Sequence, residues 1–204
     1  MTTKILLALT LLAGAVQAQT VTGKAFGTYV NAAGVTSQSP VATLPSSGGM
    51  ATGQADAFGV AGAVDASWLN AVTTGAVDNK KSGAQSTSEL EQVSAAGGAI
   101  TADIVTAVAT AYFGQFTGGS DGEGSGFTNL VVNGEAITTE VAPNTRVDLP
   151  GVGYAVLNEQ IPTGDGLTSW GMTVNMIHVV LQDALLGLTT GEIIIGSASS
   201  SVAR

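Results

Sequence analysis

The chain has 204 residues, of which 45% are hydrophobic and only 10% are charged, and its formal net charge at pH 7 is −9. Six basic residues against fifteen acidic ones disfavour binding to nucleic acid or to anionic membranes, because basic patches supply the energy of such binding. The sequence contains no cysteine, which excludes thiol catalysis, cysteine-ligated zinc, iron–sulfur clusters and disulfide bonds.

The first 18 residues have the pattern of a secretory signal peptide. Lys4 precedes the short apolar run Ile5–Val16, and small residues surround a cleavage point after Ala18. A membrane-spanning helix needs about 20 apolar residues, so this run is too short to be one. We therefore expect a signal-peptide helix over residues 1–18 and a single β-rich domain over residues 19–204. The protein is expected to be secreted, with no transmembrane or covalent anchor.

From Val21 onward, short segments rich in β-branched residues alternate with Gly, Pro, Asn and Asp. About ten such segments, without a sustained amphipathic helix, predict an all-β fold. The pattern favours an antiparallel β-sandwich or jelly-roll, with a β-solenoid as the alternative. The polar stretch Asp78–Thr87 has the composition of an exposed loop.

Two later segments are more specific. Thr and Val recur so densely in Ile100–Gly114 that a strand, with small residues on both faces, is favoured over a helix. Asn133-Gly134 predicts a β-hairpin with a type I′ turn, because both central residues of that turn need positive φ.

The last third of the chain predicts a strand over Trp170–Gln182, in which Met172, Val174, Met176, His178 and Val180 would share one face. A helical turn is expected near Asp183–Leu186. The final strand, Glu192–Val202, is the segment expected to lie at a sheet edge and to pair with another molecule.

Several segments together resemble the bacterial choice-of-anchor P family. They are GAITADIVTAVATA (98–111), FTNLVVNGEAI (127–137), APNTRVDLPGVGYAVLNEQ (142–160), MTVNMIHVVL (172–181) and GEIIIGSASSSV (191–202), in that order. The resemblance implies a secreted or surface-displayed bacterial β-domain. It implies no catalytic residues.

Few residues could support catalysis. His178 is the single histidine, no G-x-S-x-G motif accompanies it, and a packed strand histidine with one hydrogen bond is the favoured interpretation. A glycosidase would need a pair of carboxylates. The candidates for such a pair are Glu89, Glu91, Glu135, Glu140, Glu159 and Glu192.

Two ligand sites can be hypothesised. Asp121 and Glu123, in a glycine-rich segment, could contribute oxygen ligands to calcium. Trp68 and Trp170 could stack against a carbohydrate, although aromatic residues make up only 5% of the chain. No other cofactor is implied.

The sequence thus favours a secreted bacterial β-domain with a structural, surface-matrix or interaction role and no catalysis. Its expected partners are cell-surface or matrix components, or further copies of itself paired through edge strands. A carbohydrate- or calcium-binding module is the alternative, and a carboxylate-based hydrolase is the least favoured class.

Overall fold

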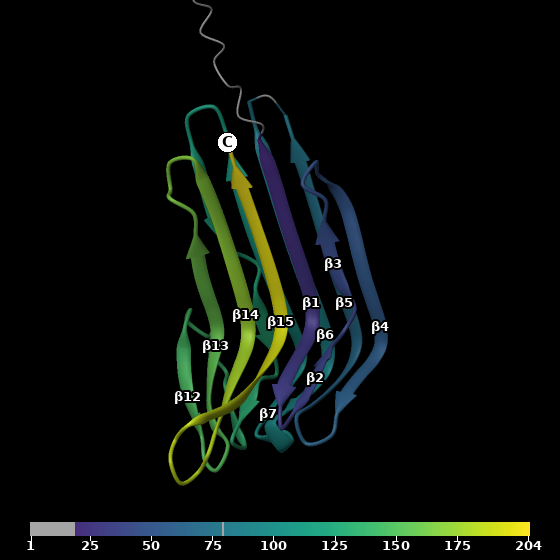
Figure 1. Ribbon diagram of the computed structural model, residues 1–204. Helices are drawn as coiled ribbons and strands as arrows, with labels where there is room; N and C mark the ends of the chain where they lie inside the picture. Colours follow the sequence, from purple (N-terminus) through teal and green to yellow (C-terminus); the bar gives the residue numbers. More distant parts are fainter. Residues whose placement is uncertain (1–18, 79) are drawn as a thin grey trace, which may run out of the picture.

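The computed structural model describes residues 19–78 and 80–204, so the predicted signal peptide at 1–18 lies outside the described residues. The described chain is all-β, with two antiparallel sheets and a single helical segment, the 3-10 turn η1 (Ala96–Gly98). Figure 1 shows the sheets as two layers of long strands, with one sheet in front of the other. We call the front layer sheet A and the back layer sheet B.

Sheet A contains, in spatial order, β12 (Thr145–Leu149), β13 (Gly153–Thr163), β14 (Ser169–Gln182), β15 (Thr189–Ala203), β1 (Thr20–Ala32) and β2 (Val35–Gln38), and β3 (Val41–Leu44) also pairs with β1. Sheet B contains β11 (Glu135–Ala136), β10 (Val131–Val132), β7 (Ile100–Phe113), β6 (Ser82–Ala95), β5 (Val64–Val77) and β4 (Gly49–Val60), while β8 (Gly118–Asp121) and β9 (Gly126–Thr128) also pair with β7.

The expectation that the final strand lies at an edge is wrong. β15 is hydrogen-bonded to β1 on one side and to β14 on the other, so both of its backbone edges are occupied. The first and last strands of the described chain are therefore neighbours inside sheet A, as Figure 1 shows.

Other local predictions are confirmed. Ile100–Phe113 is the strand β7. Asn133 and Gly134 have φ values of 53° and 81° and join β10 to β11 as a tight hairpin. The predicted exposed loop Asp78–Thr87 is confirmed only at its start, because β6 begins at Ser82.

One row of residues across each sheet lacks ladder partners. The register is the same on both sides of it except between β5 and β6, where the pairing is irregular between Asp65 and Asn70. In sheet A, for example, Leu157 pairs with Ile177 and Glu159 with Asn175, while the residues between them have no ladder partner. We call this feature the unpaired row: Asn158, Met176, Gly196 and Gly27 in sheet A, and Asp56, Trp68, Gln92 and Asp103 in sheet B.

The unpaired row exchanges the inner and outer faces of each strand. Successive side chains of a strand point to opposite faces, so one unpaired residue moves all later residues to the other face. In β15 the buried positions are Ile193 and Ile195 before Gly196, but Ala198 and Val202 after it. Backbone conformation supports the change, because Asn158, Trp68, Gln92 and Gly196 all have positive φ.

The predicted face of β14 is therefore wrong beyond Met176. Met172, Val174 and Met176 are buried as expected, but the next buried residues are Ile177 and Val179. His178 and Val180 lie on the partly exposed outer face.

The space between the sheets is filled differently on the two sides of the unpaired row. On one side lie large buried apolar residues, which include Val93, Ile100, Leu157, Ile177 and Ile193. On the other side the buried residues are mostly small, and they include Ala25, Ala71, Ala84, Ala111 and Ala198.

Hydroxyl groups link the sheets in this second half. The buried Ser86 Oγ donates to the Ser199 carbonyl at 2.8 Å and lies 2.9 Å from Thr73 Oγ1 and 3.0 Å from Ser200 Oγ. A Cβ atom on Gly23 would lie only 2.0 Å from Thr73 Oγ1. Around Ser86 and Gly23 the sheets thus approach so closely that only small side chains fit between them.

Gly196 gives a test of this packing. Its φ is +64°, and a Cβ atom would lie 2.9 Å from Val105 Cγ1 on the facing sheet. We expect Gly196→Ala to destabilise the fold by about 1–2 kcal/mol for the left-handed backbone and by about 1–3 kcal/mol more for overpacking. Urea unfolding measures the loss. The matched control is Gly126→Ala, where nothing lies within 4 Å of the added atom. Equal stability of the two variants would contradict the proposed packing.

Candidate functional site

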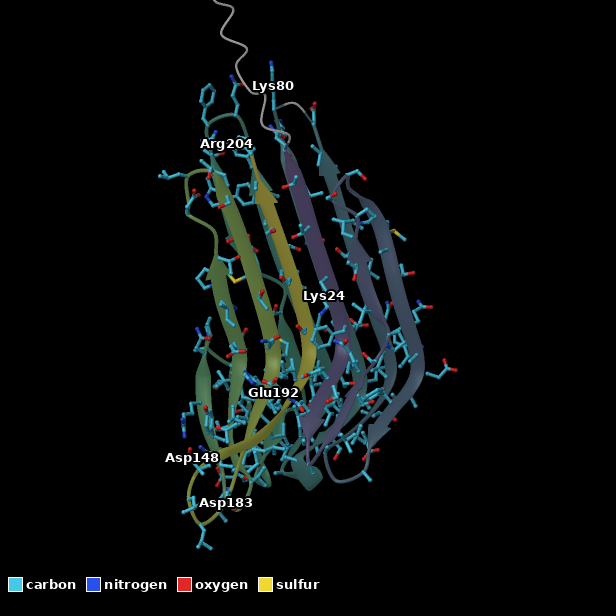
Figure 2. The ribbon with its side chains drawn as sticks, viewed as in Figure 1. Lys24, Lys80, Asp148, Asp183, Glu192 and Arg204 are labelled. Atoms are coloured by element: carbon cyan, nitrogen blue, oxygen red, sulfur yellow. The ribbon has the colours of Figure 1, made fainter. Side chains whose placement is uncertain are left out.

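The outer face of sheet A carries a group of linked polar side chains. It comprises Glu159 on β13, Asn175 and His178 on β14, and Glu192 and Ser197 on β15. We call it the imidazole cluster. Figure 2 shows Glu192 on this face, over β15.

The hydrogen bonds of the imidazole cluster form one chain across three strands. Ser197 Oγ donates to Asn175 Oδ1 at 2.8 Å, and Asn175 Nδ2 donates to Glu159 Oε2 at 2.7 Å. His178 Nδ1 lies 3.0 Å from Glu159 Oε2, and His178 Nε2 lies 3.2 Å from Glu192 Oε2. The histidine therefore links β13 to β15 across β14.

The unpaired row is what brings these residues together. Asn175 and His178 are three positions apart, so they would point to opposite faces of a regular strand. Met176 lies between them in the unpaired row and places both side chains on the outer face. Periodicity alone could not find this site, because the shift depends on backbone conformation rather than on residue type.

Electrostatics favours the charged form of each partner. Hydrogen bonding to Glu159 raises the pKa of His178 above its ordinary value despite burial, and Glu192 adds to the effect. The pKa of Glu159 is lowered, first by the hydrogen bond from His178. Only an imidazolium can donate from both ring nitrogens, and here both face carboxylates.

This arrangement is suited to holding strands rather than to acid–base catalysis. A general base needs a ring nitrogen that can accept a proton from the nucleophile. Both nitrogens of His178 are engaged by carboxylates, and Ser197 Oγ contacts Asn175 instead. The predicted single hydrogen bond of His178 is thus replaced by contacts to two glutamates.

The other candidate carboxylates are dispersed. Glu89 and Glu91 lie on β6, and Glu135 lies on β11. Glu140 lines a cavity of about 670 Å³, beside Phe127, Asn158 and Met176, and it is the only acidic side chain in that lining. A glycosidase pair on opposite sides of a sugar would need a second carboxylate there.

The hypothetical calcium loop holds its own carboxylate. Asp121 ends β8, and its Oδ1 accepts a hydrogen bond from the Glu123 backbone N–H at 3.1 Å. Within residues 19–78 and 80–204, no group of three or more His, Asp or Glu side chains is arranged to hold a metal ion. Calcium binding at Asp121 and Glu123 stays a prediction.

The two tryptophans lie in different sheets. Trp68 belongs to the unpaired row of sheet B and is 54% exposed. Trp170 stacks on Phe113 with ring centroids 5.5 Å apart, and the Arg204 guanidinium lies 4.7 Å from the Phe113 ring centroid. The two tryptophans therefore do not form one stacking platform for a sugar.

The most exposed apolar side chains lie at the two ends of the molecule. Leu185, Leu186 and Leu188, on the β14–β15 turn, are 92%, 71% and 62% exposed. Asp183 Oδ1 accepts the backbone N–H groups of Leu185 and Leu186, both at 2.9 Å, and the N–H of Gly187 bonds the Asp183 carbonyl. The predicted helical turn is thus present as a single ordered turn, which we call the leucine tip (183–188).

The opposite end carries a cavity of about 400 Å³ that we call the aromatic cavity. Phe116 and Leu167, on its rim, are 89% and 71% exposed. Its lining consists of Phe113, Gln115, Phe116, Thr117, Gly118, Gly166, Leu167, Trp170 and Arg204. Sequence reasoning missed both ends, since loop leucines and phenylalanines carry no periodic signal.

Comparison with known proteins adds no assignment: no family model, no curated protein and no solved structure matches this chain. In the described part of the chain, no helix has the length and apolar character required to span a membrane.

The imidazole cluster predicts a pH-dependent stability. The raised pKa of His178 stabilises the folded state, and this stabilisation is complete below pH 6.5. It is lost as the pH rises through the pKa of His178 in the folded protein. The lowered pKa of Glu159 stabilises the folded state above pH 4.5. This stabilisation is lost as the pH falls through the pKa of Glu159 in the folded protein. We expect His178→Gln to cost about 1 kcal/mol more at about pH 5.5 than at about pH 9.

Urea unfolding of wild type and variant at the two pH values measures this difference. In a Glu159→Gln background, the pH dependence of the His178→Gln effect should shrink, because the partner is already gone. An effect of the same size at both pH values would disprove the ionic role of His178.

Proposed function

We propose that this protein is an exported bacterial β-sandwich domain of the choice-of-anchor P type, with a structural or interaction role and no catalytic activity. The two stacked sheets with antiparallel pairing support the sandwich over a solenoid. The motifs of the choice-of-anchor P family and the leader-like residues 1–18 support the family and the export.

The leucine tip is the observation that carries the interaction role. Burial of one exposed leucine side chain is favourable by about 1.5–3 kcal/mol. Here three leucines are exposed on a turn that backbone and Asp183 hydrogen bonds hold in one conformation. An ordered apolar projection of this kind suits docking, because little entropy remains to be lost on binding.

The imidazole cluster supports the absence of catalysis. The single imidazole of the chain is held between two carboxylates, and the cavity beside Glu140 is lined by one acidic side chain. The protein surface is therefore proposed to act through contacts, in a cell-surface layer, a matrix or a complex.

Fractionation of a native culture tests the proposal. We expect the protein in the medium or at the cell surface, shortened by its leader, and accessible to protease added outside intact cells. We also expect no turnover on a panel of glycoside and ester substrates. Exclusive recovery from the cytosol with the leader intact, or turnover abolished by Glu159→Gln, would refute it.

A further inference from the structure

We propose that the leucine tip of one molecule docks in the aromatic cavity of a second copy, so that the protein associates end to end. This inference rests on the proposed interaction role and names its partner.

The two surfaces match in chemistry. The leucine tip presents three apolar side chains, and the aromatic cavity is lined by two phenylalanines, a tryptophan and a leucine. Interface cores combine aromatic anchors with aliphatic side chains in the same way, with polar groups at the rim. On each surface at least one apolar side chain is left uncovered by the described residues, since Phe116 and Leu185 are about nine-tenths exposed, whereas Phe113 is buried against Trp170 and Arg204.

Charge complements the apolar match. Arg204 rims the aromatic cavity, and Lys80 and Lys81 lie at the same end, although Asp78 and Asp165 lie there too. Figure 2 shows Lys80 and Arg204 at one end of the molecule, and Asp148 and Asp183 at the other. Asp148 is paired with Arg146 at 3.3 Å. In the proposed contact, Asp183 at the base of the leucine tip would be the acidic group that faces Arg204 of the second copy.

Arg204 and Asp183 can each form this ion pair in addition to the hydrogen bonds that they already make. Arg204 Nη2 donates to the Leu167 carbonyl at 2.8 Å, and a guanidinium has five N–H donors. Asp183 Oδ1 accepts two backbone N–H groups, while a carboxylate offers about four acceptor positions.

Distance makes the contact intermolecular. The leucine tip and the aromatic cavity lie at opposite ends of strands such as β14, whose 14 residues span about 45 Å. A molecule therefore cannot fill its own cavity. Because the two surfaces differ, a bound pair leaves one leucine tip and one aromatic cavity unoccupied. Association therefore continues as an open row unless the rotation closes a ring.

Two variants of exposed residues test the proposal. Leu185→Ser/Leu186→Ser removes the tip, and Phe116→Ser/Leu167→Ser removes the rim of the cavity. The matched control is Met50→Ser on the edge strand β4, which is 68% exposed. We expect sedimentation velocity from micromolar to millimolar concentration to show concentration-dependent assembly of the wild type and the control, and at least about tenfold weaker association of both variants. Equal thermal melting of all four proteins verifies their folding.

Mixing the two variants gives the sharpest result. Each variant keeps one intact surface, so an equimolar mixture should form heterodimers that grow no further. A second test is the Asp183→Asn variant, which keeps the Oδ1 acceptor of the turn but removes the charge. We expect it to weaken association and to reduce the salt dependence of association.

A wild type that stays monomeric overturns the inference, as does assembly that survives either variant, fails in the Met50→Ser control, or grows beyond dimers in the mixture. These results are separable from the proposed function. An exported monomer would refute end-to-end association alone, whereas an assembling protein confined to the cytosol would refute the export and leave the contact standing.

Discussion

The unpaired row is the constraint on which the rest of this structure depends. A single residue outside the ladder reverses the facing of every residue that follows it in a strand. Here the long strands of both sheets carry such a residue at matching positions, so the register is kept in every pair of long strands except β5–β6 while the faces exchange. A shift in one strand alone would have placed its apolar residues in water, because its neighbours would not have shifted with it.

The row also explains why one molecule has two kinds of interior. On the side of Ile193 and Ile195, large aliphatic residues fill the space between the sheets. On the side of Ala198 and Ser200, the sheets are close enough for hydroxyl groups to bond across the gap. The small buried residues of this half thus have a structural cause: closely packed sheets favour small side chains, and buried hydroxyls are stabilised where they find partners.

Local chemistry was sufficient for much of the fold. The β-branched density of Ile100–Phe113 and the turn chemistry of Asn133-Gly134 each act within a few residues, and both predictions are confirmed. The exposed loop at Asp78–Thr87 was overestimated, because Ser82, Ser86 and Ser88 look polar in sequence but are buried between close sheets. The local sequence does not indicate the distance to the opposite sheet.

Long-range pairing was harder still. The edge position expected for Glu192–Val202 is wrong because β1, about 170 residues away in sequence, occupies one side of that strand. The face of His178 was missed because the conformation of Met176 and its neighbours is set by the whole row. Hydrophobic periodicity therefore could not predict that the residues of the imidazole cluster meet, or that the side chains at the two ends are exposed.

The same physics separates the faces of the molecule from its ends. Along the strands, backbone groups pair in the ladders outside the unpaired row, and His178 is held between Glu159 and Glu192 on the sheet surface. At the ends the ladder stops, and turns such as the leucine tip are shaped by their own hydrogen bonds rather than by neighbours. Apolar side chains at these turns gain nothing from the core, because the core ends before them. Exposed apolar side chains that gather at one place are typical of interaction sites, and the proposed end-to-end contact rests on this property.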